Sequence, residues 1–322
     1  MMQAILPYIW IVVGFVSLTF GADFLVDGAS SVAKRMKISD LLIGLTVVAF
    51  GTSAPELVVN LVAAISGNNE IALTNVLGSN IINVFIILGV SATIYPIVCQ
   101  KSLRHFEIPL AALAGLVVLL MGMNFFIPGM GDMGISRVDG IILLLIFVFF
   151  MYKTIKTGLK DGASQTEEEV KVRALWLSLL MIAGGLALLI VGGNLIVNSA
   201  TAIARSWGVS DAIIGVTVVA LGTSLPELAT SVMAVLKKNG DMAIGNVIGS
   251  NIFNVFFVLA TSATIRPLSD YPGLLLDSAM AFLGCFLVMI FVWKGKHRIG
   301  RWQGAFMLAV YAIYLFWLIK TM

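Results

Sequence analysis

The sequence GLTVVAFGTSAPELVVNLVAA at residues 44–64 recurs as GVTVVALGTSLPELATSVMAV at residues 215–235, 171 positions later, with 12 of 21 residues identical. A second pair follows at the same offset. NVLGSNIINVFIILGVSATIYPI at residues 75–97 and NVIGSNIFNVFFVLATSATIRPL at residues 246–268 share 15 of 23 residues. The chain is therefore an internal duplication, and each copy of the first stretch carries one glutamate within an apolar run.

The composition is that of a membrane protein. Of 322 residues 59% are hydrophobic and only 11% are charged, and the mean hydropathy is +1.02, which lies outside the range of soluble domains. Apolar runs of roughly 20 residues, enough to cross a ~30 Å hydrocarbon layer as a helix, lack the alternating polarity of barrel strands. We expect ten such helices, at residues 5–33, 41–66, 71–97, 106–127, 136–157, 174–204, 212–236, 242–266, 272–293 and 302–320.

Loop charges predict the orientation of these helices. Sixteen of the 20 Lys and Arg residues lie in loops on one side of the ten spans, and the positive-inside rule assigns that side to the cytoplasm and both termini to the outside. The first apolar run lacks the basic start and cleavage site of a secretory signal, so we expect it to be retained. The plasma membrane is the expected location.

Equivalent positions of the two repeats are five helices apart. Because five is an odd number, the second repeat is expected to be inserted upside down relative to the first. The predicted fold is all-α, a polytopic membrane protein with ten transmembrane helices arranged as two inverted five-helix repeats. The first repeat is residues 1–157, a cytoplasmic linker is residues 158–173, and the second repeat is residues 174–322. Inverted repeats are typical of secondary transporters.

Both GTS-x-PE segments contain the signals of a broken helix. Gly51 and Pro55, and likewise Gly222 and Pro226, combine a flexible residue with one that has no backbone N–H. Backbone carbonyls freed within lipid must face protein, water or a cation. We therefore expect an ion site at these two segments.

Polar residues near the breaks recur at helical spacing. A spacing of four residues places Thr52, Glu56 and Asn60 on one helix face, and the second repeat has Thr223, Glu227 and Ser231 at the matching positions. The following helices carry Asn75, Ser79 and Asn83, and Asn246, Ser250 and Asn254. Small polar residues also mediate helix packing in membranes, but a duplicated charge inside an apolar span is a functional-site hypothesis by default.

All of these side chains offer oxygen, which hard cations such as Ca²⁺ prefer, whereas borderline metals would call for Cys or His. The two cysteines, Cys99 and Cys285, lack the spacing of a metal site or a disulfide framework. One Ca²⁺ or two monovalent cations would balance two ionised glutamates, and a third monovalent cation would leave the site at +1 and make exchange electrogenic. Such a site meets the minimum requirement for antiport.

GTSAPE and GTSLPE, each followed by a GSNIxN segment, resemble the paired repeats of the cation/calcium exchanger superfamily, and the nearest branch is the prokaryotic sodium/calcium exchangers. The resemblance implies an antiporter that exports Ca²⁺ using the Na⁺ gradient. It also implies that the first and sixth helices slide against the other eight. The ion ligands that it implies are Glu56, Glu227, Thr52, Thr223, Ser53, Ser224, Ser79, Ser250, Asn83, Asn254, and the carbonyls of Ala49 and Ala220.

The expected partners are the transported Ca²⁺ and Na⁺ and the lipid bilayer. We expect no cofactor, no enzymatic reaction and no nucleic-acid partner, and we expect a monomer. Asp23 and Asp27 break the repeat symmetry, because their equivalents are Asn194 and Asn198. Two interpretations of these aspartates stay open, namely interfacial or helix-capping carboxylates and carboxylates that attract cations.

Several other functions compete with sodium-driven calcium export. Proton-driven calcium exchange by the same fold requires only the glutamates. A cation channel would build its filter around a pore between subunits or repeats. An intramembrane hydrolase would use Ser53 or Ser224 as nucleophile, but no His or Lys accompanies either serine in the apolar spans to act as base.

The pair Asn83 and Asn254 predicts independence from potassium. Some exchangers that this chain resembles, including potassium-dependent ones, carry Asp where this chain has Asn254, so the site here has only two acidic groups. We expect Ca²⁺ uptake into proteoliposomes to proceed at the same rate with and without K⁺ at constant Na⁺. A measured potassium requirement would contradict the prediction.

Overall fold

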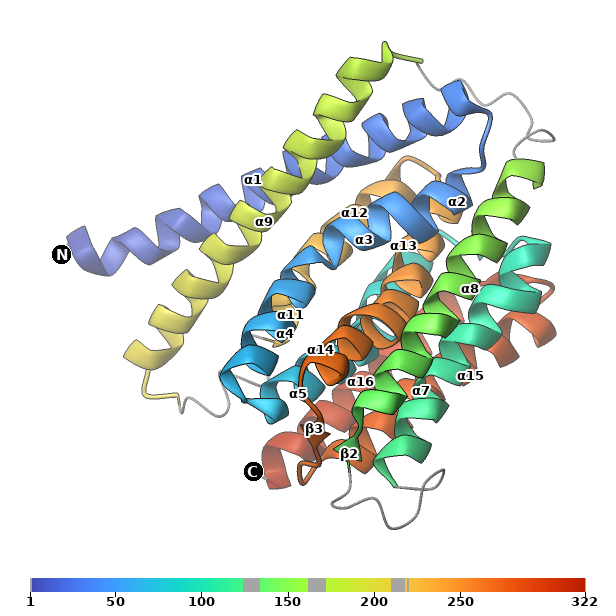
Figure 1. The fold of residues 1–322 in the computed structure, drawn as a ribbon. Helices are drawn as coiled ribbons and strands as arrows, with labels where there is room; N and C mark the ends of the chain where they lie inside the picture. Colours follow the sequence, from blue (N-terminus) through green and yellow to red (C-terminus); the bar gives the residue numbers. More distant parts are fainter. Residues whose placement is uncertain (1, 124–133, 162–171, 210–217, 219, 322) are drawn as a thin grey trace.

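The structure is a computed structural model that describes residues 2–123, 134–161, 172–209, 218 and 220–321 (Figure 1). The expected linker at 158–173 and the expected seventh span at 212–236 lie partly outside these residues. The helical elements of the first half are α1 (Met2–Met36), α2 (Asp40–Ile43), η1 (Gly44–Val48), α3 (Ala49–Thr52), α4 (Ala54–Ser66), α5 (Asn69–Ile82), η2 (Asn83–Leu88), α6 (Gly89–Ile94), η3 (Leu103–Glu107), α7 (Ile108–Gly122) and α8 (Arg137–Asp161), where η denotes a π-helical segment.

Among the described residues, the second half contains counterparts of most of these elements in the same order. Its helical elements are α9 (Leu175–Ser206), α11 (Ala220–Thr223), α12 (Leu225–Leu236), α13 (Gly240–Phe253), η6 (Asn254–Leu259), α14 (Ala260–Ile265), α15 (Leu274–Lys294) and α16 (Arg301–Thr321). Eight helices among the described residues are long and apolar enough to cross a membrane, or nine if the bent pair Asp40–Thr52 and Ala54–Ser66 forms one span. The protein is therefore a helical, multi-span membrane protein.

The prolines in the GTS-x-PE segments stand at the sites of helix breaks. Ser53, at the break between α3 and α4, has φ −83° and ψ 6°, and Ser224, between α11 and α12, has φ −90° and ψ 5°. Pro55 and Pro226 follow within the first turn of the new helix, where the missing N–H is tolerated. The first break bends its span by 47°, as the sequence predicted.

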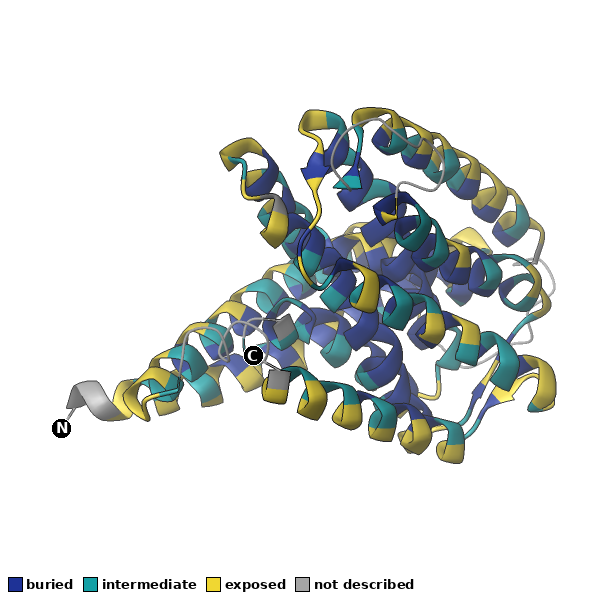
Figure 2. Cartoon of the chain, turned by 90° about the horizontal axis from the view of Figure 1, so that it is seen from below, coloured by how far each residue is buried: buried dark blue, intermediate teal, exposed yellow. Residues whose placement is uncertain are grey.

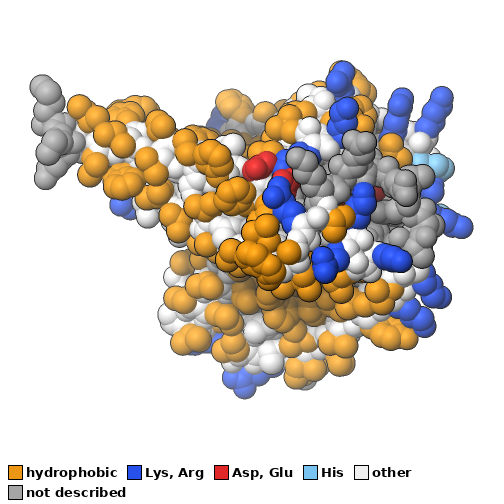
Figure 3. All heavy atoms as spheres, turned by 90° about the horizontal axis from the view of Figure 1, so that it is seen from above, with side chains coloured by type: hydrophobic (Ala, Val, Ile, Leu, Met, Phe, Trp, Pro, Cys, Tyr) orange, Lys and Arg blue, Asp and Glu red, His pale blue; other side chains and the backbone are white. Residues whose placement is uncertain are grey.

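Among the described spans, α5 and α13 with their continuations are the most buried. Figure 2 shows buried residues concentrated inside the bundle and exposed residues on its outer faces. Most side chains of α13 are buried, from Met242 to Phe253. Large apolar side chains such as Trp302 and Phe316 are exposed on the periphery, where a soluble protein would rarely gather them. Figure 3 shows hydrophobic side chains over much of the molecule and Lys and Arg gathered on the end from which it is viewed.

Two short strand pairs were not expected from the sequence. Strand β1 (Ile97–Val98) pairs with β4 (Arg298–Ile299), and β2 (Gly134–Ile135) pairs with β3 (Leu268–Ser269), both antiparallel. Proline restricts the residue before it to extended conformations, and Tyr95 before Pro96 and Arg266 before Pro267 are extended. The chain therefore leaves α6 and α14 as extended backbone, and the nearby loops satisfy its hydrogen-bonding groups.

Helices α1 and α9 lie side by side along one flank of the bundle (Figure 1). Their backbones approach closely at glycines, which is typical of helix pairs in membranes. A Cβ atom on Gly21 would lie 2.9 Å from the carbonyl oxygen of Gly185, and a Cβ atom on Gly185 would lie 2.7 Å from that of Gly21. Gly14 and Gly192 face one another in the same way. The two helices therefore form one tightly packed pair.

This packing predicts different effects for two neighbouring substitutions. Gly185→Ala places its methyl group against the backbone of α1, and overpacking of this kind destabilises by about 1–3 kcal/mol. Gly184→Ala is the control, because nothing lies within 4 Å of its added Cβ atom. We expect thermal unfolding in detergent to show a lower midpoint for Gly185→Ala only. Equal midpoints for the two variants would contradict the close approach of α1 and α9.

Candidate ion-binding site

The two glutamates of the repeats are buried immediately after the helix breaks. Glu56 lies in the first turn of α4 and is 0% exposed, and Glu227 lies in the first turn of α12 and is 1% exposed. Helix N-termini carry partial positive charge, which stabilises carboxylates there. Because the breaks start new helices at these points, each glutamate gains such a terminus in the middle of an apolar span.

The two repeats contact one another at these carboxylates. Ser53 of the first repeat donates a hydrogen bond to Glu227 Oε1 at 3.2 Å, and Thr52 also interacts with the Glu227 carboxylate. In the reverse direction, Thr223 interacts with the carboxylate of Glu56, and the two glutamates interact electrostatically. The structure therefore brings both predicted acids and three of the predicted hydroxyl residues into one site.

The helix that follows each break completes the surroundings of its glutamate. Ser79 of α5 donates to Glu56 Oε1 at 3.4 Å. In the second repeat, Asn246 of α13 donates to the backbone carbonyl of Glu227 at 3.3 Å and accepts from the Thr52 hydroxyl at 3.1 Å. The two halves thus share hydrogen bonds as well as charge.

Several buried oxygens around the glutamates have no hydrogen-bond partner within the protein. Buried polar atoms are nearly always paired, and unpaired ones call for an explanation such as an ion. The carboxylate and amide oxygens come in pairs related by the repeat. The serines are the exception, because Ser53 and Ser79, the equivalents of Ser224 and Ser250, donate to the glutamates. The atoms are Glu56 Oε2, Glu227 Oε2, Asn83 Oδ1, Asn254 Oδ1, Ser224 Oγ and Ser250 Oγ. All belong to residues that the sequence proposed as cation ligands.

Two asparagines that were not among the predicted site residues hold this arrangement in place. Asn80 accepts from the Asn254 amide at 3.1 Å, and Asn251 accepts from the Asn83 amide at 3.0 Å. Asn80 and Asn251 also each donate to the other's backbone carbonyl, both at 3.3 Å. Because the amide groups of Asn83 and Asn254 are used in this way, their oxygens stay available. The duplicated GSN tripeptide was the sequence signal for this network.

The asparagines with available oxygens also begin π-helical segments. Segment η2 starts at Asn83 and η6 starts at Asn254, and π-helical turns occur frequently at functional sites. Their presence at both repeats was not evident from the residue spacing.

Other predicted positions have a different environment. The carbonyl of Ala49 accepts the Ser53 amide at 3.0 Å, so this backbone group remains within the helix ladder. Ala220 begins α11. Asn60, which shares a helix face with Glu56, donates to the Ala72 carbonyl at 2.9 Å and so ties α4 to α5.

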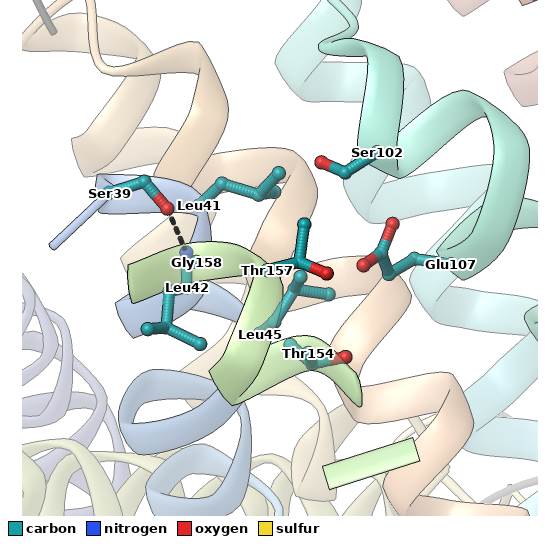
Figure 4. Close-up of a pocket in the computed structure, with 9 residues that line it drawn as sticks. All are labelled: Ser39, Leu41, Leu42, Leu45, Ser102, Glu107, Thr154, Thr157 and Gly158. Atoms are coloured by element: carbon teal, nitrogen blue, oxygen red, sulfur yellow. Dashed lines mark hydrogen bonds between the residues drawn. The ribbon is translucent and has the colours of Figure 1, made fainter. Parts of the chain in front are cut away.

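A separate pocket lies between α2, η3 and α8 (Figure 4). The carboxyl group of Glu107, a buried residue, and the hydroxyl of Thr157 point toward one another across it. The Ser39 hydroxyl on its border accepts the Leu42 amide at 3.1 Å. Glu107 is the single acid among the residues that line this pocket, and its equivalent in the second repeat is Ser278. Among the described residues, no three His, Cys, Asp or Glu side chains are close enough to form a conventional metal centre.

Apolar spans around two facing buried carboxylates and available oxygens define a membrane transporter of cations. A family model described as sodium/calcium exchanger protein matches residues 6–156 and 177–320. The chain belongs to the sodium/calcium exchanger family, which confirms the resemblance seen in the repeated motifs.

Individual relatives match over nearly their full length. The putative antiporter CaxA of Alkalimonas amylolytica is 36% identical, with 97% of this chain and 98% of the relative covered. The sodium/calcium exchanger MaX1 of Methanosarcina acetivorans is 28% identical, with 96% and 97% covered. A structure of the sodium-calcium exchanger NCX_Mj soaked with Na⁺ and Sr²⁺ matches with a TM-score of 0.82 at 34% identity, over 96% of this chain and 97% of that chain.

The asparagine network predicts a role for Asn80 in ion affinity. Asn80→Ala removes the acceptor of the buried Asn254 amide, and an orphaned buried donor is unfavourable by about 1–3 kcal/mol. We expect the half-saturating Ca²⁺ concentration for transport to rise by about tenfold. Ser91→Ala is the control, because it deletes a buried hydroxyl without a hydrogen-bond partner. Similar half-saturating concentrations in the two variants would exclude this role.

Proposed function

We propose that the protein is a sodium/calcium antiporter that exports Ca²⁺ from the cytoplasm using the Na⁺ gradient. The observation that carries the proposal is the pair of facing buried glutamates surrounded by oxygens without a protein partner. The relatives named sodium/calcium exchanger support sodium as the driving ion. The ratio of hydroxyl and amide oxygens to acids also favours sodium, because proton coupling needs only the carboxylates.

In this proposal the transported ions share one set of ligands. Glu56 and Glu227 hold Ca²⁺ or Na⁺ at the centre, with Asn83 and Asn254 beside them. Thr52 and Thr223 assist the two glutamates at the centre. The flanking sodium ligands are Ser53, Ser224, Ser79, Ser250 and the carbonyls of Ala49 and Ala220. The repulsion between two buried carboxylates disfavours a site without cations. The protein therefore exchanges bound Ca²⁺ for bound Na⁺.

Charge balance predicts the electrical character of exchange. Two carboxylates neutralise one Ca²⁺ or two Na⁺, so exchange of three or more Na⁺ for one Ca²⁺ moves net charge. Each elementary charge that crosses a potential of 100 mV changes the free energy by about 2.3 kcal/mol. We propose that three or more Na⁺ are exchanged for each Ca²⁺, so that exchange is electrogenic and driven by the membrane potential as well as by sodium.

The proposed topology comprises ten spans in two inverted repeats, at residues 1–157 and 174–322, joined by a cytoplasmic linker at 158–173. Two observations support a two-fold relation of the halves, namely the reciprocal bonds of Asn80 and Asn251 and the pairing of α1 with α9. In the proposal both termini lie outside, the chain is a monomer in the plasma membrane, and α12 with the segment before it forms the seventh span. Inverted halves can exchange roles as the site opens to either side.

The central experiment measures sodium-dependent ⁴⁵Ca²⁺ uptake into proteoliposomes for Glu56→Gln and Glu227→Gln. Each substitution keeps the side-chain shape but removes one of two buried charges, and loss of one partner of a buried charge pair weakens an interaction by about 3–5 kcal/mol. We expect uptake to fall at least about 100-fold, with normal membrane insertion.

Glu70→Gln is the control, because Glu70 is an exposed residue in the first turn of α5. Robust exchange by Glu56→Gln or Glu227→Gln would remove these residues from the mechanism. Uptake that survives removal of the sodium gradient but collapses with a proton uncoupler would replace sodium by protons in the proposal. Unitary currents in planar bilayers would instead indicate a channel.

A further inference from the structure

Lys237 directly follows α12 and reaches across to α1. Its Nζ atom lies 2.5 Å from Asp27 Oδ1 and 2.6 Å from Asp23 Oδ1, and it donates to the backbone carbonyl of Asp23 at 3.3 Å. A lysine ammonium has three N–H donors, so oxygens of α1 can accept all three. Asp23 and Asp27, whose equivalents in the second repeat are asparagines, thus both contact Lys237, which directly follows the helix that carries Glu227.

This cluster joins two parts of the molecule. On one side, α1 is bound to α9 through the close glycine contacts and through Ser31, which accepts the Arg173 amide at 2.9 Å and the Ser178 hydroxyl at 2.8 Å. On the other side, Lys237 and Asn239 belong to the α12–α13 connection, and Asn239 donates to Ser30 of α1 at 3.3 Å. The cluster therefore fastens the α1–α9 pair to the helices of the ion site.

Other basic residues lie close to the cluster in the chain, namely Lys238 and, in the last turn of α1, Lys34 and Arg35. Side-chain exposure is 28% for Lys237, 41% for Asp23 and 36% for Asp27. Water therefore reaches the ion pairs, and an interaction of this kind can break and re-form without the loss of a buried charge. Arg173 lies 3.5 Å from Asp27 but precedes α9, so it stays within the helix pair.

The other repeat has no charged counterpart of this cluster. At an offset of 171, Lys237 corresponds to Ser66, Asp23 to Asn194 and Asp27 to Asn198. The Ser66 hydroxyl bonds within its own helix, at 2.7 Å from the carbonyl of Val62, and both asparagines are exposed. If the two repeats exchanged roles in a second conformation, the equivalent contact would join the neutral side chains of Ser66, Asn194 and Asn198. In the present conformation the contact is made by ion pairs.

We infer that Lys237 is a positioning residue that, through Asp23 and Asp27, latches the α1–α9 pair to α12 and favours the state closed toward the cytoplasm. The inference rests on the proposed alternating access and on the proposed orientation, in which the α12–α13 connection faces the cytoplasm. An interaction made in only one of two states shifts the equilibrium toward that state. The apparent affinity on each face follows the fraction of protein open to it, so the latch lowers apparent affinity at the cytoplasmic face and raises it at the outer face.

The test measures half-saturating Ca²⁺ for exchange at each face, in inside-out and right-side-out membrane vesicles. We expect the half-saturating Ca²⁺ concentration to decrease about threefold at the cytoplasmic face and to increase by a similar factor at the outer face. This holds for Lys237→Gln and, separately, for the double variant Asp23→Asn with Asp27→Asn. Lys238→Gln is the matched control, because it removes the same charge from the adjacent exposed residue.

Opposite shifts at the two faces separate a latch from simple damage, which would weaken both faces together. Identical behaviour of Lys237→Gln and Lys238→Gln, or parallel weakening at both faces, would overturn the inference. Raising ionic strength from about 0.02 to 0.5 M with choline chloride screens exposed ion pairs. That change should shift the half-saturating Ca²⁺ concentrations of the wild-type protein in the same directions as Lys237→Gln does, and it should leave those of the variant unchanged. A wild-type protein that does not respond to ionic strength also overturns the inference. Absence of sodium-dependent Ca²⁺ flux in the wild type would instead defeat the proposed function.

Discussion

The repulsion and desolvation of two carboxylates in the middle of the bundle constrain the rest of the structure. Glu56 and Glu227 are buried from solvent and interact with one another, and charges in such an environment require compensation. Hydroxyl groups of Ser53 and Ser79 satisfy one oxygen of each carboxylate, and the other oxygen has no protein partner. This division leaves part of each acid for a mobile cation, which a transporter needs and a permanently paired charge would prevent.

The helix breaks and the asparagine network make the close approach of the acids compatible with an apolar interior. Each break starts a new helix, whose N-terminal turn contains the glutamate. Asn80 and Asn251 fix the amides of the neighbouring asparagines, so that carbonyl oxygens rather than N–H groups remain free. Cations are attracted by such oxygens and repelled by amide hydrogens, so the orientation of these side chains favours a cation over an anion.

Much of this arrangement could be predicted from the sequence because duplication and helical spacing are direct consequences of the residues. The breaks at Pro55 and Pro226, the helical multi-span membrane architecture and the convergence of the two glutamates follow from composition and from the offset of 171, whereas the described residues show eight or nine of the ten predicted spans. The supporting role of Asn80 and Asn251 could not be derived, because it depends on contacts between helices that are far apart in the chain. The π-helical segments and the short strand pairs likewise depend on local geometry that residue type alone does not specify.

The glycines between α1 and α9 have a mechanical consequence. Gly14, Gly21 and Gly28 recur every seven residues, and they face Gly192, Gly185 and the backbone of Ser178, which have the same period. A seven-residue repeat keeps one seam of each helix against its partner along a shared supercoil. Two helices packed in this way behave as a single rigid unit, and this unit contains one helix from each half of the duplication. Because their backbones are in contact at several points, displacement of one of these helices would carry the other with it.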